Sequence, residues 1–231
     1  SFKGDYLKIP LLKNQLGITS EERITNSIQN LEYALANSFN QLTHPKSRKI
    51  AALKGNGELD DKFIADFFST LRDSYYIAPF TLDSLSNSPA KTLELIKEFD
   101  LLVIARPTKK FTEKEKYLLD QYIMSGGSTL WLIDKVQFVN DSIGGNNFAF
   151  ARDLNLTDFF FRYGIRVNSN LVKDLYSAPI ILASGEERES QYNRYPWFYN
   201  PLSASNSKHP ITTNIEGVKF EYASSIDTLP N

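Results

Sequence analysis

Residues 99–134 hold the feature that constrains the fold most strongly, two apolar segments separated by a charged one. Their sequence is FDLLVIARPTKKFTEKEKYLLDQYIMSGGSTLWLID. The first apolar run stops at Arg106, Gly126 and Gly127 end the charged segment, and the second apolar run stops at Asp134. This order predicts a strand, a crossover helix and a second strand, with polar residues where both strands end.

The same alternation of apolar and amphipathic segments precedes this stretch. Apolar runs at 48–55, 75–82 and 100–107 predict strands, and amphipathic segments at 61–75 and 88–99 predict helices. Near-continuous apolar strands that alternate with helices are typical of a parallel sheet with helices on both faces. We therefore predict an α/β fold with a flavodoxin-like (amidotransferase-like), doubly wound parallel sheet.

The first 46 residues follow a different pattern. Residues 1–12 predict a strand hairpin with a very short first strand, so we expect the chain to begin inside structure that belongs to a preceding region. Residues 19–42 predict one long helix that Thr19 and Glu22 begin as a capping box. Apolar residues recur along it at steps of three and four, namely Ile24, Ile28, Leu31, Leu35, Phe39 and Leu42. The helix either packs on its own domain or docks against a partner or a missing domain.

Beyond Asp134 the pattern becomes irregular. Residues 144–153 and 185–210 predict loops, residues 154–164 a short helix, and residues 165–175, 178–184 and 218–227 extended segments. A loop as long as 185–210 inside a domain is usually functional or disordered. We therefore divide the chain into a strand hairpin and long helix at 1–46, which are either a remnant of a preceding domain or a connector to it, and an α/β domain with extended C-terminal loops at 47–231.

An aromatic cluster lies within the 185–210 loop, in the sequence YNRYPWFYNP. Its rings belong to Tyr192, Tyr195, Trp197, Phe198 and Tyr199. Rigid aromatic rings bury large areas at low entropic cost, which suits a contact with a protein or a sugar. The alternative is a loop that its own rings hold against the core.

The composition excludes several classes of partner and site. Lys and Arg total 26 and Asp and Glu total 27, so the net charge of −1 gives no general attraction for nucleic acid or anionic membrane. The chain has no cysteine, which removes thiol catalysis, disulfides and cysteine-based zinc sites. No apolar run approaches the roughly 18–20 residues that span a bilayer.

Polar residues follow three of the predicted strands at the edge where parallel sheets bind ligands. Asn56 and Glu58 follow the first strand, Arg106 follows the third, and Asp134 follows the fourth. They form either a charged cluster that binds a polar ligand or a purely structural set. In the structural alternative, Asp134 caps the next segment and Arg106 pairs with a nearby carboxylate.

Catalytic, metal and cofactor motifs are missing from the sequence. There is no G-x-S-x-G nucleophile turn, no H-x-x-x-H pair, no repeated acidic ligand spacing and no phosphate-binding loop. His44 and His209 both precede proline, a position that favours extended turns, so we interpret them as loop residues. We therefore expect a non-enzymatic protein without a metal ion or cofactor.

Several stretches, in this order along the chain, together resemble the GldG family of gliding-motility-type ABC transporter auxiliary components. They are ITNSIQNLEYALANSFNQL, KIAALKGNGELDD, DLLVIARPTKKFTEKEKYLLDQYIMSGGSTLWLID, YGIRVNSNLVKD, and PWFYNPL followed by HPITTNIEGVKFEYASSIDTL. One departure is Asn56, where the resemblance leads us to expect histidine in a GHGE version of the loop. This departure weakens a ligand-binding role for that loop.

The resemblance implies a membrane-anchored protein with a large region at the periplasmic face of the inner membrane. It implies a position beside the permease and ATPase subunits of a transporter linked to gliding motility. It also implies a domain type shared with eukaryotic intraflagellar-transport proteins, which favours assembly over catalysis. The family provides no catalytic residues to carry over.

Three functional hypotheses result. The leading one is a non-enzymatic accessory domain of an ABC transporter that acts through protein–protein contacts. The alternative is a solute-binding module that recognises a polar ligand or sugar at the crevice of Glu58, Arg106 and Asp134, with Trp197 stacking on a sugar. The least favoured is a hydrolase-like enzyme, because the motifs of such enzymes are missing.

Overall fold

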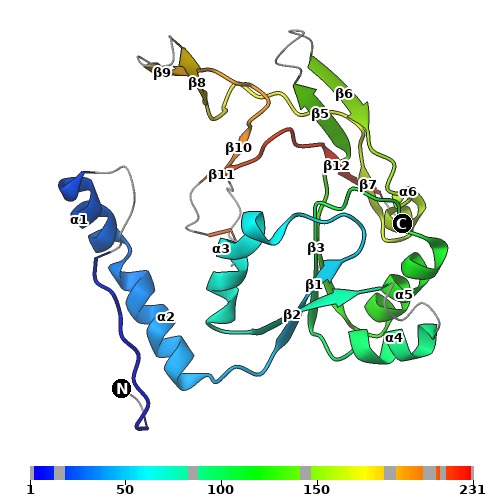
Figure 1. The fold of residues 1–231 in the computed structure, drawn as a ribbon, viewed down its shortest axis with the longest axis horizontal. Helices are drawn as coiled ribbons and strands as arrows, with labels where there is room; N and C mark the ends of the chain where they lie inside the picture. Colours follow the sequence, from blue (N-terminus) through cyan, green and yellow to red (C-terminus); the bar gives the residue numbers. More distant parts are fainter. Residues whose placement is uncertain are drawn as a thin grey trace.

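A four-stranded parallel sheet lies at the centre of the computed structural model (Figure 1). The structure describes residues 3–12, 19–82, 88–140, 147–184, 191–204, 212–213 and 217–229. The strand order is β2-β1-β3-β4, with bounds β1 Lys49–Lys54, β2 Tyr76–Thr81, β3 Leu101–Ala105 and β4 Ser128–Leu132. Each of these strands coincides with an apolar run that the sequence predicted to be a strand.

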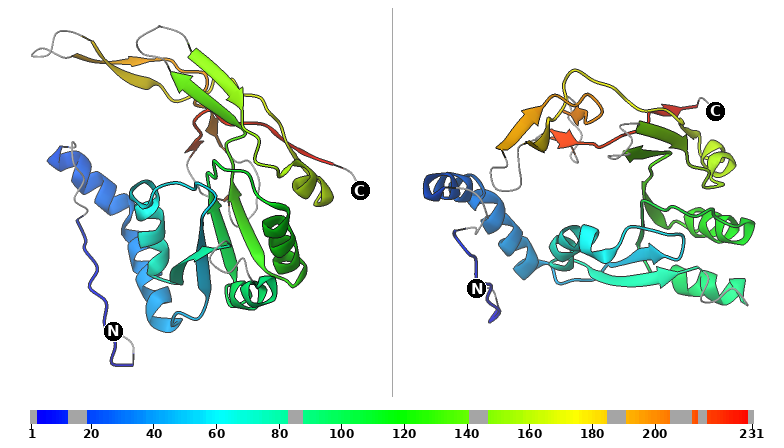
Figure 2. Two further views of the ribbon diagram at one scale, coloured as in Figure 1. Left: turned by 45° about the vertical axis from the view of Figure 1, so that its right-hand side comes forward. Right: turned by 45° about the horizontal axis from the view of Figure 1, so that its top comes forward.

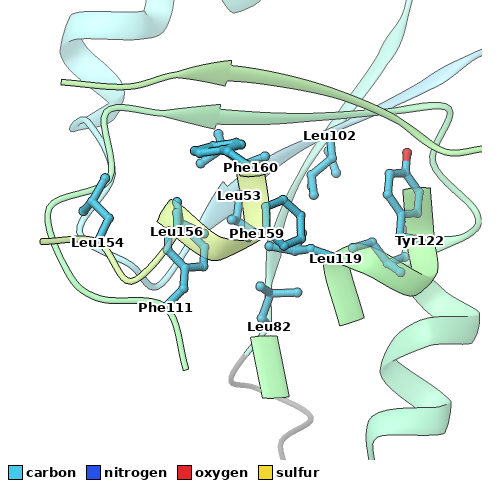
Figure 3. Packing of buried hydrophobic residues seen from close by; sticks show 13 residues of the cluster. Leu53, Leu82, Leu102, Phe111, Leu119, Tyr122, Leu154, Leu156, Phe159 and Phe160 are labelled. Atoms are coloured by element: carbon cyan, nitrogen blue, oxygen red, sulfur yellow. The ribbon is translucent and has the colours of Figure 1, made fainter. Parts of the chain in front are cut away.

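Helices cover the two faces of this sheet unequally (Figure 2). On one face, α3 (Asp61–Arg72) packs Ile64 and Phe68 against residues of β1 and β3. On the other face lie α4 (Pro89–Ile96), α5 (Glu113–Met124) and α6 (Thr157–Arg162). This second face carries the larger core, drawn in Figure 3, to which the helices contribute Ile96, Leu119, Tyr122, Phe159 and Phe160.

The register of β3 and β4 decides which side chains reach each core. Val103 pairs with Leu130 and Ala105 with Leu132, so these residues share the face that α3 covers. Ile104 pairs with Trp131 on the opposite face, where the indole packs against the rings of Phe111, Phe159 and Phe160. The β4 strand is therefore well covered on the α5 side only, and Leu130 and Leu132 remain exposed.

The N-terminal segment forms an arm beside α3 that stands apart from the sheet (Figures 1 and 2). The predicted single helix is two helices, α1 Ser20–Gln29 and α2 Leu31–Thr43. The break falls at Asn30, a residue type that is less favourable in helix interiors than at helix ends, although its side chain makes no capping hydrogen bond here. Thr19 and Glu22 form the predicted capping box. The second strand of the predicted hairpin is wrong, because residues 6–12 are irregular.

Short antiparallel strand pairs follow β4 and lie above the sheet in Figure 1. The pairs are β5 Val136–Asn140 with β6 Asn147–Ala151, β7 Ile165–Val167 with β12 Ile226–Thr228, β8 Ile180–Ser184 with β9 Gln191–Tyr195, and β10 Leu202–Ser203 with β11 Val218–Lys219. Two loop predictions are therefore wrong in part. The 144–153 loop contains β6, and the 185–210 loop contains β9 and β10.

The central sheet and its helices confirm the predicted α/β class. The order β2-β1-β3-β4 is compatible with a flavodoxin-like (amidotransferase-like) arrangement, and that finer assignment stays a prediction. The division of the chain at residue 46 also stays a prediction. The carboxyl ends of the parallel strands point toward the antiparallel pairs, and Arg106 and Asp134 lie there.

Candidate functional site

Arg106 and Asp134 meet at the carboxyl ends of β3 and β4. The Arg106 Nε donates a hydrogen bond to the Asp134 Oδ2 at 2.6 Å, and both side chains remain partly exposed to solvent. The sequence left two interpretations open, a charged cluster that binds a polar ligand or a structural pairing of Arg106 with a nearby carboxylate. The geometry is compatible with either a ligand-binding pair or a structural one.

The backbone of Arg106 has an unusual conformation. Its φ angle is +52°, in the left-handed region that costs an L-residue roughly 1–2 kcal/mol. The Arg106 N–H donates to the Leu132 carbonyl at 2.8 Å, which continues the β3–β4 ladder past the end of the strand. Strained residues of this kind cluster at functional sites, because there the side-chain direction matters more than the local cost.

The Arg106–Asp134 pair opens into a groove of about 460 Å³ between the sheet and the β5–β6 hairpin. This volume lies in the range of ligand pockets, roughly 300–1,000 Å³. Its walls are apolar and aromatic, and Phe138 stacks on Tyr222 with ring centroids 4.3 Å apart. The remaining lining side chains are Leu59, Phe63, Val136 and Glu221. The groove therefore combines aromatic surfaces with the Arg106–Asp134 pair and the Glu221 carboxylate.

Arg152, which the sequence reasoning missed, lies close to this pair. Its Nη1 is buried and has no hydrogen-bond partner among the described residues. Burial lowers the pKa of the Arg152 guanidinium, the Asp134 carboxylate opposes that shift, and Arg106 adds to it. No local motif marks this residue, because it reaches the site through the pairing of β5 with β6. At the end of this hairpin the Lys135 carbonyl accepts the Arg152 N–H at 2.7 Å.

Asn56 is placed for structure and does not line the groove. Only 3% of the residue is exposed, and its Nδ2 donates to the Glu115 Oε1 at 3.1 Å. Its carbonyl accepts the N–H groups of Thr108 and Lys109 at 2.9 and 2.8 Å. Asn56 therefore joins the loop after β1 to the loop after β3 and to the first turn of α5.

Glu58 is also directed into its own loop. Its Oε2 accepts the Asn56 N–H at 2.9 Å, while its Oε1 is buried without a hydrogen-bond partner among the described residues. Burial raises the pKa of the Glu58 carboxyl, and N–H groups of the loop oppose the shift. Glu58 lines a separate, open hollow beside Lys54 and Lys109. The four predicted strand-end residues are thus divided: Arg106 and Asp134 line the groove, whereas Asn56 and Glu58 lie in the loop after β1.

Trp197 lies behind the groove wall. Its ring packs edge-on against Tyr199 and Tyr222 at centroid distances of 5.9 and 6.5 Å, and its Nε1 is buried without a partner in the described structure. Tyr222, which lines the groove, was not predicted as a site residue. The aromatic segment therefore divides between its two interpretations, because Trp197 and Tyr199 pack inward while Tyr192 and Tyr195 are exposed.

The other expectations about chemistry can be compared with the described parts of the chain. Within those ranges no group of three or more His, Asp or Glu residues is arranged to hold a metal ion. None of the helices there is both long and apolar enough to cross a bilayer. His44 caps α2 and lies 2.9 Å from the Thr43 hydroxyl, while His209 lies outside the described residues.

Comparison with known proteins identifies the fold and the family. No curated protein matches the chain. Among solved structures, the mmIFT52 N-terminal domain is similar with a TM-score of 0.52 and 16% sequence identity, over 78% of this chain and 68% of that one. This likeness concerns the fold alone. The family described as ABC-type uncharacterized transport system matches residues 47–231, which include the whole central sheet and the groove. The chain therefore belongs to this family of auxiliary components of ABC-type transport systems.

Proposed function

We propose that the protein is a GldG-type, non-enzymatic accessory domain of a membrane-anchored ABC transporter component linked to gliding motility. It works at the periplasmic face of the inner membrane through protein–protein contacts, beside the permease and ATPase subunits of the transporter. The family supports the transport role, and the sequence resemblance supports its finer details. The described lining of the groove offers the Arg106–Asp134 pair, the Glu221 carboxylate and aromatic rings.

The observation that carries a protein-contact role is the outer face of the β5–β6 hairpin. Val139, Phe148 and Phe150 share this face, and all three are exposed. The Phe148 and Phe150 rings stack with their centroids 6.1 Å apart, which presents one continuous apolar surface. Contiguous apolar surface of this kind marks interaction sites in proteins.

Purification of the tagged full-length protein from membranes tests this proposal. We expect a permease and an ATPase subunit to co-purify with it. Phe150→Glu should abolish the association, whereas Tyr117→Glu should preserve it, because Tyr117 is an equally exposed aromatic residue on α5, away from the hairpin. Recovery of the wild-type protein without either subunit would contradict the proposal.

A second candidate function is solute binding, and the groove beside Arg106 and Asp134 favours it. A sugar would stack on the aromatic wall of Phe138 and Tyr222 and hydrogen-bond to the charged pair. A ligand at ~100 times its dissociation constant adds about 2.7 kcal/mol of stability, which is at least ~5 °C in the unfolding midpoint for a chain of this size. A shift of that size with a sugar, lost in Arg106→Ala and Asp134→Ala, would establish the function. A panel of sugars without any shift would refute it for this ligand class.

A further inference from the structure

This chain carries two exposed apolar surfaces, and the first is a stripe along the N-terminal arm. Ile24, Ile28, Leu31, Leu35 and Phe39 recur at helical spacing along α1 and α2, and all are exposed. Ile28 and Phe39 are 67% and 68% exposed. A helix with such a stripe is stable in water mainly when the stripe is packed against another surface.

The second surface is the half of the sheet that α3 leaves open. Leu130 and Leu132 lie on the α3 face of β4, and they are 36% and 47% exposed. The flank of α3 beside them carries Phe63 and Phe67, both exposed. Phe63 shares the groove with Arg106 and Asp134, which follow β3 and β4, so this flank faces the open half. A parallel sheet normally has helices along both faces, and among the described residues no helix covers β4 on this face.

We infer that this open face is the docking site for the arm of a second copy of the same chain, and that two copies exchange arms in a symmetric dimer. In a two-fold dimer, the stripe of each copy would pack on the uncovered sheet face of the other copy, so the same two surfaces meet twice. Within one copy, the described residues of the arm make no extensive packing contact with the sheet. Residues 44–48, with Pro45 among them, form an extended joint between the arm and β1.

The size of the contact is sufficient for a stable dimer. With exposed fractions from 36% to 68%, the side chains of the stripe and the open face remove on the order of 800 Å² from water in each arm contact. The two-fold operation makes this contact twice. The total, about 1,600 Å², equals the standard size of a specific protein interface. This inference does not depend on the transporter role.

Sedimentation of the full chain at micromolar concentration tests the arm exchange. We expect a dimer, and we expect Leu35→Glu to raise its dissociation constant at least tenfold, because the charge enters both contacts. Ala36→Glu introduces the same side chain at the adjacent position, off the stripe, and should leave the dimer intact. A monomeric wild-type chain, or a dimer that tolerates Leu35→Glu, would overturn the inference.

Cross-linking distinguishes exchange between copies from folding back within one copy. Because the chain has no cysteine, single substitutions give unambiguous attachment points. A tagged Leu35→Cys chain mixed with an untagged Leu132→Cys chain should give a mixed dimer with a short bismaleimide linker. If the double variant instead cross-links only within single chains, and the mixed species does not form, the arm covers its own sheet and the exchange is refuted.

Discussion

Two substitutions of Arg106 test whether its left-handed backbone conformation lowers the stability of the fold. Arg106→Ala removes the ion pair with Asp134 but retains a Cβ at φ +52°. Arg106→Gly removes the same pair and relieves the left-handed strain, because glycine adopts positive φ freely. The difference in stability between the two variants therefore reports on the backbone conformation at residue 106 alone.

The expected magnitudes follow from exposure and conformation. An ion pair between partly exposed side chains contributes about 0–1 kcal/mol, which limits the loss in both variants. The left-handed conformation costs an L-residue roughly 1–2 kcal/mol. Glycine avoids this cost but destabilises the fold by about 0.5–1 kcal/mol relative to alanine, because it loses more conformational entropy on folding. We expect Arg106→Gly to be the more stable variant by about 1 kcal/mol, or roughly 2–4 °C in the midpoint for 231 residues.

Thermal unfolding followed by circular dichroism measures this difference. Arg166 provides the matched control, since its Nη2 lies 2.6 Å from the Asp227 Oδ2, its side chain is also about half exposed, and it lies in the regular strand β7. There the order should reverse, and Arg166→Gly should be less stable than Arg166→Ala. If Arg106→Gly is instead the less stable variant at its site, the strain argument is wrong. A loss well above 1 kcal/mol in Arg106→Ala would show that the pair is structural.

Three further predictions concern single positions. Burial raises the pKa of the Glu58 carboxyl above its ordinary value of 4.5, so the stability that the protonated form provides is lost as pH rises through the folded-state pKa. Urea titrations from pH 4 to 8 should therefore show wild type losing stability relative to Glu58→Gln, and parallel curves would contradict this. Gly127→Ala should lower the midpoint by roughly 2–12 °C, because the new methyl would enter the space of the buried Tyr122 ring. Lys116→Met should shift the midpoint by less than ~4 °C. The buried ammonium pairs with Glu113 and Asp158, and both carboxylates are exposed enough to be hydrated by water when the ammonium is removed.

The sequence predicted the elements whose signals are local. Thr112 and Glu115 begin α5 with a capping box, and Gly126 follows its end with φ +95°, where helix, turn and strand were expected. The apolar runs of β1, β3 and β4 needed no tertiary information, because strands buried by helices are apolar along most of their length.

The misses involve pairings between distant residues. In β6 the alternation of Asn147, Phe148, Ala149, Phe150 and Ala151 has the period of a strand, but neighbouring glycine and asparagine residues favoured a loop. The partner strand β5 decides the outcome, and the sequence does not identify it. Arg152 and Tyr222 escaped notice for the same reason, since each reaches the groove through the fold of the antiparallel segments.

The division of the strand-end residues decides where function should be tested. Asn56 hydrogen-bonds to Glu115 of α5 and Glu58 accepts a hydrogen bond within the loop after β1, so substitutions there would disturb folding and binding together. Among the described residues, the side chains of Arg106 and Asp134 hydrogen-bond to each other and face an open groove, so their loss would report on binding with little structural cost. Phe63 lines that groove and also borders the open sheet face. An arm docked on that face would contact one wall of the groove. Dimerisation would then change the affinity of the groove for a ligand, and the ligand would change the affinity of the dimer by the same factor.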